Sequence, residues 1–194
     1  DVHLGNGTED IFRDDSRESE TTTKYDLTMA MGGLGKLQAG GSVKIFHLNY
    51  AAASPIGNDS PFSLTPSVNA FSLTRAFPAY QTGAYVQATR DVGPRVNLTI
   101  GGRFDDYRFG GDRRFSPRAG ASVAVSPRLS WRASYGRYYQ QPFFLFLAAF
   151  PQNAALVPLR ADHVVTGLSY ELSRRTRVTV EAYRKTYRDY PVST

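Results

Sequence analysis

Polar and apolar residues alternate along about eight stretches of the chain, each roughly ten residues long, from about residue 22 onward. Over 129–136, for example, the odd positions are Leu, Trp, Ala and Tyr, and the even positions are Ser, Arg, Ser and Gly. Successive side chains of a β-strand point to opposite faces, so each stretch predicts a strand with one uncharged and one polar face. The predicted strands lie at about 22–32, 36–50, 79–91, 95–108, 117–126, 128–139, 162–173 and 175–189.

The charged residues inside these strands fall on the polar parity almost without exception. They are Lys24, Asp26, Lys44, Arg103, Asp105, Arg118, Arg132, Glu171, Glu181 and Lys185. The exceptions, Arg90, Arg137 and Arg184, lie near predicted strand ends. A Lys or Arg that faces lipid costs roughly 2–4 kcal/mol at the middle of a bilayer and much less near its surfaces. This distribution is what a transmembrane β-barrel requires, although alternation alone does not say which face points inward.

The connections between the predicted strands alternate in length. Short turns are expected around 33–35, 91–94, 126–127 and 173–174, and long loops at about 51–78, 109–116 and 140–161. Short periplasmic turns and long extracellular loops are typical of outer-membrane barrels. We therefore expect an all-β, antiparallel up-and-down transmembrane barrel over residues 22–194, with about eight strands of a larger barrel. Residues 1–21 are polar and rich in acids, and we interpret them as a loop or lead-in.

Composition narrows the class of protein. No apolar run of the 194 residues approaches the roughly 18 that a membrane helix needs. Cysteine is absent, and the net charge is +6. Because the basic residues are dispersed among apolar ones, we expect no nucleic-acid partner. The positive net charge is also consistent with loop arginines that contact anionic lipopolysaccharide. The chain starts without a signal sequence and stops just after a predicted strand, so we expect a fragment of a longer protein.

No residue pattern predicts a catalytic, metal or cofactor site. His3, His47 and His163 are too far apart in sequence for a metal-binding motif. Asp105 and Asp106 are adjacent, so on a strand they face opposite ways and do not share a proton. A barrel hydrolase that uses Asp105, Asp106 and His163 at its rim remains a weak alternative. We therefore expect that this protein is not an enzyme.

The segment 138–151 is too apolar for a free loop and follows the end of a predicted strand. Its candidate ligand contacts are Tyr138, Tyr139, Gln140, Gln141 and Phe143. The alternative is that these side chains pack against neighbouring loops and close the mouth of the barrel.

A series of motifs carries a resemblance to a known family over about 80–190, and more loosely over 22–50. The motifs, in order, are Gly83-Ala-Tyr-Val-Gln87, Leu98-Thr-Ile-Gly-Gly-Arg-Phe-Asp105, Phe115-Ser-Pro-Arg118, Leu129-Ser-Trp-Arg-Ala-Ser-Tyr-Gly136, Gly167-Leu-Ser-Tyr-Glu171 and Val178-Thr-Val-Glu-Ala-Tyr183, with Asn153, Leu156, Pro158, Arg160 and Ala161 between the fourth and fifth. Together they resemble the barrel strands of TonB-dependent outer-membrane receptors. Leu159 stands where that family usually has an acid, and Arg184 where an aromatic residue is common.

The resemblance implies a place in the bacterial outer membrane and a function in transport. Such receptors have about twenty-two strands around a plug domain that contacts TonB, and no plug is visible in this chain. They take up a scarce solute such as a metal chelate (siderophore), a cofactor or an oligosaccharide. In the family, a short turn of helix often follows the strand that ends near residue 139. Two alternatives stay open. One is a passive porin or small eight-stranded barrel, in which 22–32 pairs with 175–189, and the other is a soluble β-rich domain with its apolar face buried.

Overall fold

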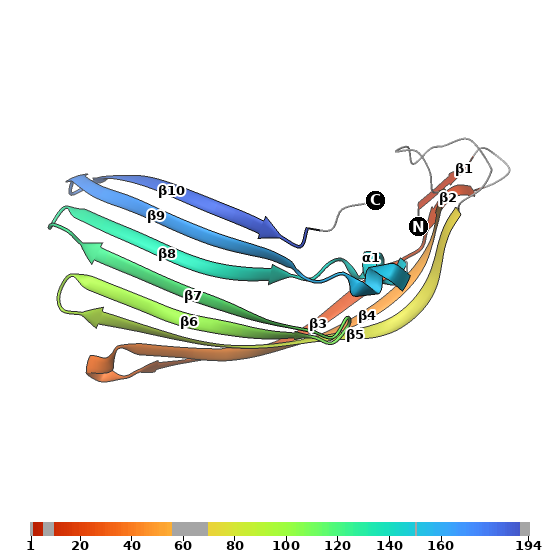
Figure 1. Ribbon diagram of the computed structural model, residues 1–194, viewed down its shortest axis with the longest axis horizontal. Helices are drawn as coiled ribbons and strands as arrows, with labels where there is room; N and C mark the ends of the chain where they lie inside the picture. The colour runs from red at the N-terminus through yellow and green to blue at the C-terminus, as the bar shows by residue number, and fades with distance from the viewer. Residues whose placement is uncertain (1, 6–9, 56–69, 150, 191–194) are drawn as a thin grey trace. The chain divides into compact units, whose positions relative to one another are not determined.

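The computed structural model describes residues 2–5, 10–55, 70–149 and 151–190, and these residues are mostly in antiparallel strands (Figure 1). The strands are β1 (Val2–Gly5), β2 (Asp10–Asp14), β3 (Arg17–Ala30), β4 (Lys36–Pro55), β5 (Ala70–Val92), β6 (Val96–Tyr107), β7 (Asp112–Ala124), β8 (Leu129–Gln140), β9 (Leu159–Ser173) and β10 (Thr176–Arg188). The helical elements are η1 (Gly32–Leu34), α1 (Phe144–Ala149) and η2 (Pro151–Ala155).

The described strands form one sheet in the order β1-β2-β4-β5-β6-β7-β8-β9-β10, with β3 paired to β4. From β3 to β10 each strand pairs with the next in sequence, which is the up-and-down topology that the alternation predicted. Within the described residues β10 pairs only with β9, so the sheet is not closed. A complete eight-stranded barrel would need residues 22–32 to pair with 175–189, and the structure does not favour that alternative.

The predicted strands agree with the observed ones to within a few residues over most of their length. Predicted strands 95–108, 128–139 and 175–189 correspond to β6, β8 and β10. The short turns also lie where they were expected, between β5 and β6, between β7 and β8 and between β9 and β10.

The N-terminal segment differs from the expected loop over 1–21, because it contains β1, β2 and the start of β3. Residues Val2 and Asp14 pair across β1 and β2, and Arg13 pairs with Ala53 of β4. These are backbone pairings, which a polar sequence can make as well as an apolar one. Strands of only four and five residues show too little alternation to stand out in this acid-rich segment.

Two expected long loops are also shorter than predicted. Strand β6 ends at Tyr107 and β7 begins at Asp112, so the loop expected over 109–116 is a tight connection. Gly110 and Gly111 make it possible, because their φ angles of 95° and 71° are left-handed, a conformation that favours glycine. In the loop expected over 51–78, β4 continues to Pro55 and β5 starts at Ala70. The remainder of that loop, 56–69, lies outside the described residues.

The chain divides into two compact units. Unit 1 comprises residues 1–22, 44–80 and 143–156, and unit 2 comprises residues 23–43, 81–142 and 157–194. The register of unit 2 aligns residues of one parity in rows across the strands. One row runs from Gln87 through Gly101, Arg118 and Gly136 to His163, and ends at Lys185 on β10. The polar parities of β5 to β10 therefore share one face of the sheet, as predicted.

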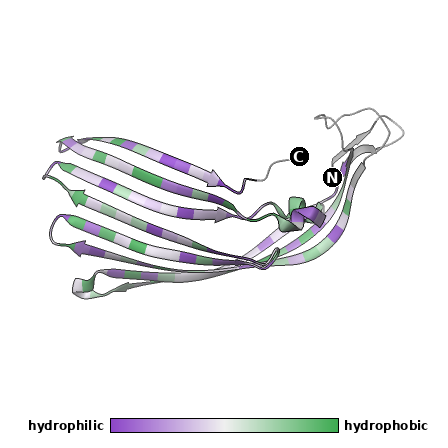
Figure 2. Cartoon of the chain, in the orientation of Figure 1, coloured by the Kyte–Doolittle hydropathy of each residue, from purple (hydrophilic) through white to green (hydrophobic). Residues whose placement is uncertain are grey.

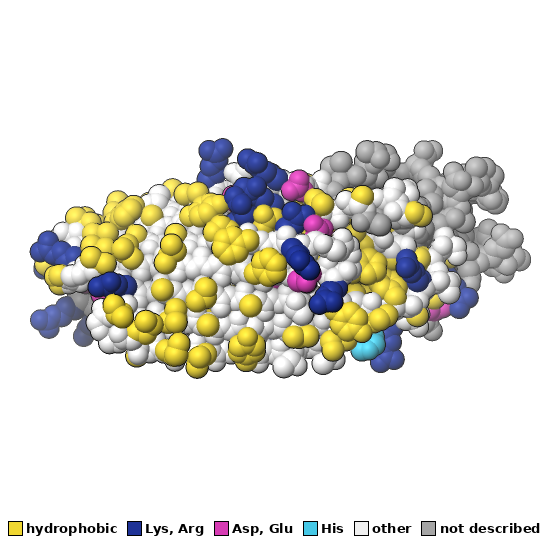
Figure 3. All heavy atoms as spheres, turned by 60° about the horizontal axis from the view of Figure 1, so that its bottom comes forward, with side chains coloured by type: hydrophobic (Ala, Val, Ile, Leu, Met, Phe, Trp, Pro, Cys, Tyr) yellow, Lys and Arg dark blue, Asp and Glu magenta, His cyan; other side chains and the backbone are white. Residues whose placement is uncertain are grey.

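The opposite face of unit 2 is apolar and exposed. The side chains of Ile100 and Val180 are 69% and 68% exposed. Other exposed apolar side chains of this face are Val86, Leu98, Phe104, Val164, Leu168 and Val178. Hydrophobic and hydrophilic residues alternate along the strands in Figure 2, and Figure 3 shows a face on which hydrophobic side chains are widespread. An apolar face of this extent marks contact with lipid or a partner, and it contradicts a soluble domain that buries its apolar parity.

Within the described residues, no helix has the length and apolar character needed to cross a membrane.

Candidate functional site

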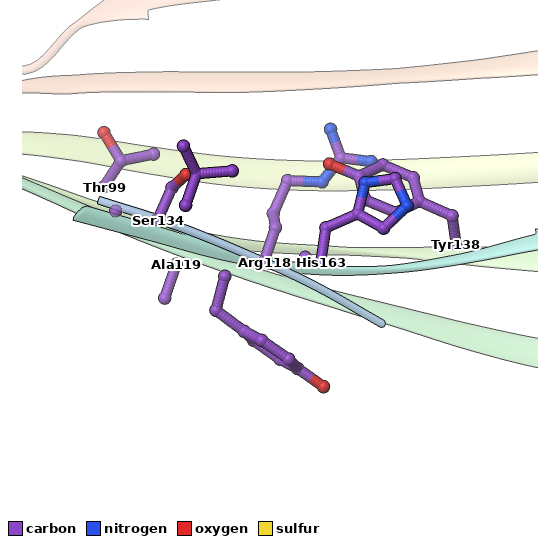
Figure 4. A pocket seen from close by; sticks show the side chains of 10 residues that line it. Thr99, Arg118, Ala119, Ser134, Tyr138 and His163 are labelled. Atoms are coloured by element: carbon purple, nitrogen blue, oxygen red, sulfur yellow. The ribbon is translucent and has the colours of Figure 1, made fainter. Parts of the chain in front are cut away.

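A hollow of about 260 Å³ lies on the polar face of unit 2, between β6 and β9. It is lined by Thr99, Arg118, Ala119, Gly120, Ser134, Tyr135, Gly136, Tyr138, His163 and Val165. In Figure 4 the side chains of Arg118, Tyr138 and His163 lie close together on one side of the sheet, and Ala119 points to the other side. The hollow thus presents a cation, a phenol and an imidazole together.

The strand register explains why these three side chains meet. Arg118 on β7 pairs with Gly136 on β8, and Gly136 pairs with His163 on β9. A Cβ atom on Gly136 would lie 2.6 Å from the Tyr138 hydroxyl, so the glycine leaves room for the phenol above its own strand. The Tyr138 ring also contacts His163, with centroids 4.8 Å apart and planes tilted by 44°.

Most other charged side chains on the polar face of unit 2 have partners. The guanidinium of Arg103 donates from Nε to both carboxylate oxygens of Asp105 at 2.9 Å, and also donates to Ser42 Oγ at 3.3 Å. Arg132 donates to Ser169 Oγ at 2.9 Å. Arg118, by contrast, makes no hydrogen bond or ion pair within the described part of the chain. Its charge is therefore available to an anionic ligand.

Four of the five predicted contact residues lie at the end of β8 or just after it, in unit 2. Tyr138 lines the hollow, and Gln140 is exposed. The ring of Tyr139 lies 5.6 Å from the Arg114 guanidinium, within the range of a cation–π contact. Gln141 donates from Nε2 to the carbonyl of Phe109 at 3.2 Å and so fastens the chain after β8 to the turn after β6. Tyr139 and Gln141 thus have structural contacts of their own.

The fifth predicted residue, Phe143, belongs to unit 1, where α1 provides the short helix that the resemblance implied. Phe144 packs on Phe46 with ring centroids 4.8 Å apart, and Leu147 and Ala148 are buried. Phe143 itself is 68% exposed and meets Phe146 edge-on. Other residues of this segment are therefore buried, while Phe143 presents an aromatic surface.

Unit 1 contains a group of buried side chains on its parts of β4 and β5. Leu48 is 2% and Tyr50 is 1% exposed, and Leu73 and Ala79 are also buried. The Tyr50 hydroxyl donates to a carboxylate oxygen of Glu18. A membrane strand needs about 9–11 residues, so Tyr50, well past that length from the start of β4, lies outside the membrane. Its burial and its hydrogen bond to Glu18 raise the pKa of the Tyr50 phenol well above the usual 10.0.

The residues of the weak hydrolase alternative are not brought together. Asp105 is paired with Arg103, and Asp106 on the opposite face lies 3.8 Å from both Arg108 and Arg113. His163 stands on β9, three strands away from β6 in the sheet order. In the part of the chain that the structure describes, no three His, Cys, Asp or Glu side chains gather where a metal ion could bind.

Sequence reasoning missed the association of Arg118 with His163 and Tyr138. Parity placed Arg118 and His163 on the polar face, but they are about 45 residues apart in sequence. Only the register of three strands brings them together.

Comparisons with known proteins agree with this architecture. Residues 3–194 match the family model described as TonB dependent receptor-like, β-barrel. A mutant of the ferric enterobactin receptor from Pseudomonas aeruginosa matches with a TM-score of 0.70 and 17% identity, over 89% of this chain and 27% of the receptor. The siderophore receptor PirA from Acinetobacter baumannii matches with a TM-score of 0.72 and 15% identity, over 90% of this chain and 28% of that receptor. The copper transporter OprC matches with a TM-score of 0.64 and 14% identity, over 90% and 30%.

No curated protein matches the chain. The chain spans between a quarter and a third of the length of the three solved structures above, and at these identities they show the fold alone. The family model is stronger evidence, because it covers nearly every residue and agrees with the open antiparallel sheet and its exposed apolar face. The chain belongs to the TonB-dependent receptor β-barrel family, and its strands form part of the wall of a barrel in the bacterial outer membrane.

Proposed function

We propose that this chain supplies part of the wall and the solute path of an outer-membrane receptor that takes up a scarce solute. The plug domain of the intact receptor contacts TonB, which passes on energy from the inner membrane. The solute is a metal chelate of the siderophore kind, a cofactor or an oligosaccharide. The observation that supports this best is the hollow on the polar face, where Arg118 makes no hydrogen bond or ion pair with another described residue and lies beside Tyr138 and His163.

Among the three solute classes, the chemistry of the hollow favours an anionic metal chelate. A guanidinium attracts negative charge, and aromatic rings stack on the flat groups that chelators often carry. A solved structure of the Pseudomonas aeruginosa ferric enterobactin receptor contains enterobactin, and this chain resembles that receptor in fold. An uncharged oligosaccharide would leave the Arg118 charge without a partner.

The five predicted residues have different roles in this proposal. Tyr138, Gln140 and Phe143 are exposed and contact the entering solute. Tyr139 and Gln141 position the chain after β8 through Arg114 and the Phe109 carbonyl, and contact the solute less directly. None of these residues performs covalent chemistry, and the intact protein is a transporter and not an enzyme.

The proposed partners follow from the two faces. The apolar face contacts outer-membrane lipid and lipopolysaccharide, and the polar face encloses the plug. Nucleic acid is not among the proposed partners, because the basic residues are dispersed along the strands and mostly alternate with apolar ones.

An uptake assay with the intact receptor tests the proposal. The full reading frame is expressed in cells that lack their own siderophore receptors, and uptake of a panel of radiolabelled ferric chelates is measured. Arg118→Ala and Tyr138→Ala are expected to reduce uptake of the one chelate that the wild type transports. Arg177→Ala is the matched control, because Arg177 is on the same face but is paired with Glu171 far from the hollow. Wild-type uptake by both hollow variants, or no uptake of any chelate by the wild type, would refute the proposal.

A further inference from the structure

We call the apolar face of unit 2 its outward face. Toward the extracellular ends of β8, β9 and β10, the side chains on this face change from apolar to charged. Along β8 the outward side chains are Leu129, Trp131, Ala133 and Tyr135, and the next is Arg137. Along β10 Val178, Val180 and Ala182 are followed by Arg184 and, two positions beyond Thr186, by Arg188. On β9 the same change brings Arg160 and Asp162 after Val164. A basic group thus stands directly above the apolar surface on three adjacent strands.

The register gathers these residues into one cluster, which we call the rim cluster: Arg137, Arg160, Asp162, Arg184 and Arg188. Asp162 pairs with Arg137 on one side and with Thr186 on the other, and Arg160 pairs with Arg188. Arg184 pairs with Val164, one outward position below Asp162. The cluster holds four guanidinium groups and a single carboxylate. Figure 3 shows Lys and Arg side chains gathered with Asp and Glu beside hydrophobic ones on one face of the molecule.

Asp162 fixes the positions of two of the arginines. Arg137 donates from Nε to Asp162 Oδ1 at 2.8 Å, and Arg160 donates from Nε to Oδ2 at 2.8 Å. The Tyr135 hydroxyl donates to Oδ1 at 3.0 Å. The carboxylate side chain is only 17% exposed, so its lone pairs are directed at these donors. Each guanidinium has five N–H donors, and these bonds use only part of them.

The level of the cluster is set by its surroundings. Below it lie the apolar side chains of the outward face, and on β8 the amphipathic ring of Tyr135 lies one outward position below Arg137. Aromatic residues of outer-membrane barrels gather at the level of the lipid headgroups. An arginine at that depth costs little, whereas it is expensive at the middle of the bilayer. The cluster therefore lies at the level where headgroup phosphates lie.

We propose that the rim cluster is a binding site for the phosphate groups of a phosphorylated glycolipid of the outer leaflet. The net positive charge complements phosphate, and arginine binds phosphate oxygens through paired N–H donors. The continuity of the cluster with the apolar surface requires a ligand that is anionic at its head and apolar below, which excludes a soluble anion as the natural occupant. This inference deepens the lipid contact proposed above and rests on the place of the sheet in the outer membrane. It does not depend on the nature of the solute.

The test uses the intact receptor, purified in a mild detergent, and diphosphorylated lipid A as the probe, with binding measured by native mass spectrometry. The variant Arg184→Ala/Arg188→Ala leaves Asp162 and its three hydrogen-bond donors intact, so it removes charge without leaving an unpaired carboxylate. Each arginine near an anionic membrane surface strengthens binding by about fivefold, so loss of two arginines is expected to weaken binding by about thirtyfold. Arg184→Lys/Arg188→Lys is expected to bind more tightly than the alanine variant and more weakly than the wild type, because lysine keeps the charge but lacks the paired N–H donors.

The matched control is Arg174→Ala/Arg175→Ala, which removes two charges from the turn between β9 and β10 at the opposite end of the strands. It should leave lipid A binding unchanged, and a dephosphorylated lipid A should bind the wild type about as weakly as the diphosphorylated lipid binds the rim variant. Equal binding by the rim variant and the wild type, or an equal loss in the control variant, would overturn the proposal. Displacement of lipid A by equimolar inorganic phosphate would show a free-anion site and would also overturn it. Solute uptake is measured on the same rim variant and should be normal, so a failure here is separate from a failure of the transport proposal.

Discussion

The two units of the chain use apolar side chains in opposite ways. In unit 1, Leu48, Tyr50 and Leu147 are buried against protein. In unit 2, apolar side chains as large as Ile100 and Val180 are exposed on one whole face of the sheet. Strands β4 and β5 contribute residues to both units, so the difference does not come from secondary structure. It comes from the surroundings, because apolar side chains that face lipid can stay on the protein surface, whereas apolar side chains that would face water are buried against protein.

The largest expected difference between the two units is in the free-energy cost of removing an apolar side chain. Leu48→Ala should cost about 2–5 kcal/mol of folding free energy, because the packed surroundings of a buried leucine collapse only partly into the space. The loss is measured by denaturant unfolding of the intact receptor in lipid vesicles, monitored by proteolysis of unit 1. Ile100→Ala is the comparison, and it should cost much less because lipid chains fill the gap. Equal losses at the two positions would contradict the contrast between the units.

Charge should distinguish the two faces of unit 2. Ile100→Arg is expected to destabilise the folded barrel by roughly 2–4 kcal/mol, because the guanidinium is then placed against lipid near mid-bilayer. Thr99→Arg, one residue away, puts the same group on the polar face and should be tolerated. Unfolding of the two variants in vesicles measures the difference. If Thr99→Arg were the more damaging of the two, the assignment of the faces would be wrong.

Removal of one hydroxyl tests the buried cluster of unit 1. Tyr50→Phe breaks the hydrogen bond to Glu18 and should cost about 1.5–3 kcal/mol, the usual value for a bond to a charged group. The raised pKa of Tyr50 also predicts a pH dependence. The folded form holds this proton more tightly than the unfolded form, so the contribution is complete below the usual pKa of 10.0 and is lost as the pH rises above it.

Hydrogen exchange of β4 amides between pH 8 and 11 measures this effect. Tyr50→Phe should remove the alkaline loss of protection, whereas Tyr25→Phe, at an exposed position of β3, should retain it. An alkaline transition that persists in Tyr50→Phe would assign it to another group.

The smallest effect is expected at a solvated ion pair of the polar face. Arg177 and Glu171 form an ion pair at the turn end of β9 and β10, with side chains 62% and 46% exposed. Arg177→Ala should change stability by less than about 1 kcal/mol, because water screens such pairs. A loss as large as that of Leu48→Ala in the same unfolding assay would mean that this face is dry.

The sequence alone predicted most of the strands and their polar and apolar faces. Alternation from Leu129 to Gly136 located β8 and its two faces, and the charge parity placed Arg103, Arg118 and Arg132 on one side of the sheet. It failed at β1 and β2, two short strands inside the segment expected to be a loop, and at Gly110-Gly111, where two left-handed glycines shorten an expected loop. The five candidate contact residues followed from the apolar composition of segment 138–151. Their different contacts with neighbouring residues, which the sequence did not reveal, distinguish their proposed roles.

Period-2 patterning by itself determined that this chain forms amphipathic strands, because side chains of a strand must alternate between faces whatever surrounds them. Only the tertiary structure decided which distant residues meet. Register brings Arg118 to His163 and Arg137 to Asp162, and a shift of one residue in any pairing would send these side chains to opposite faces. The exposed apolar face likewise appeared only in the assembled sheet, because alternation is the same for a strand that faces lipid and for one that faces a buried core.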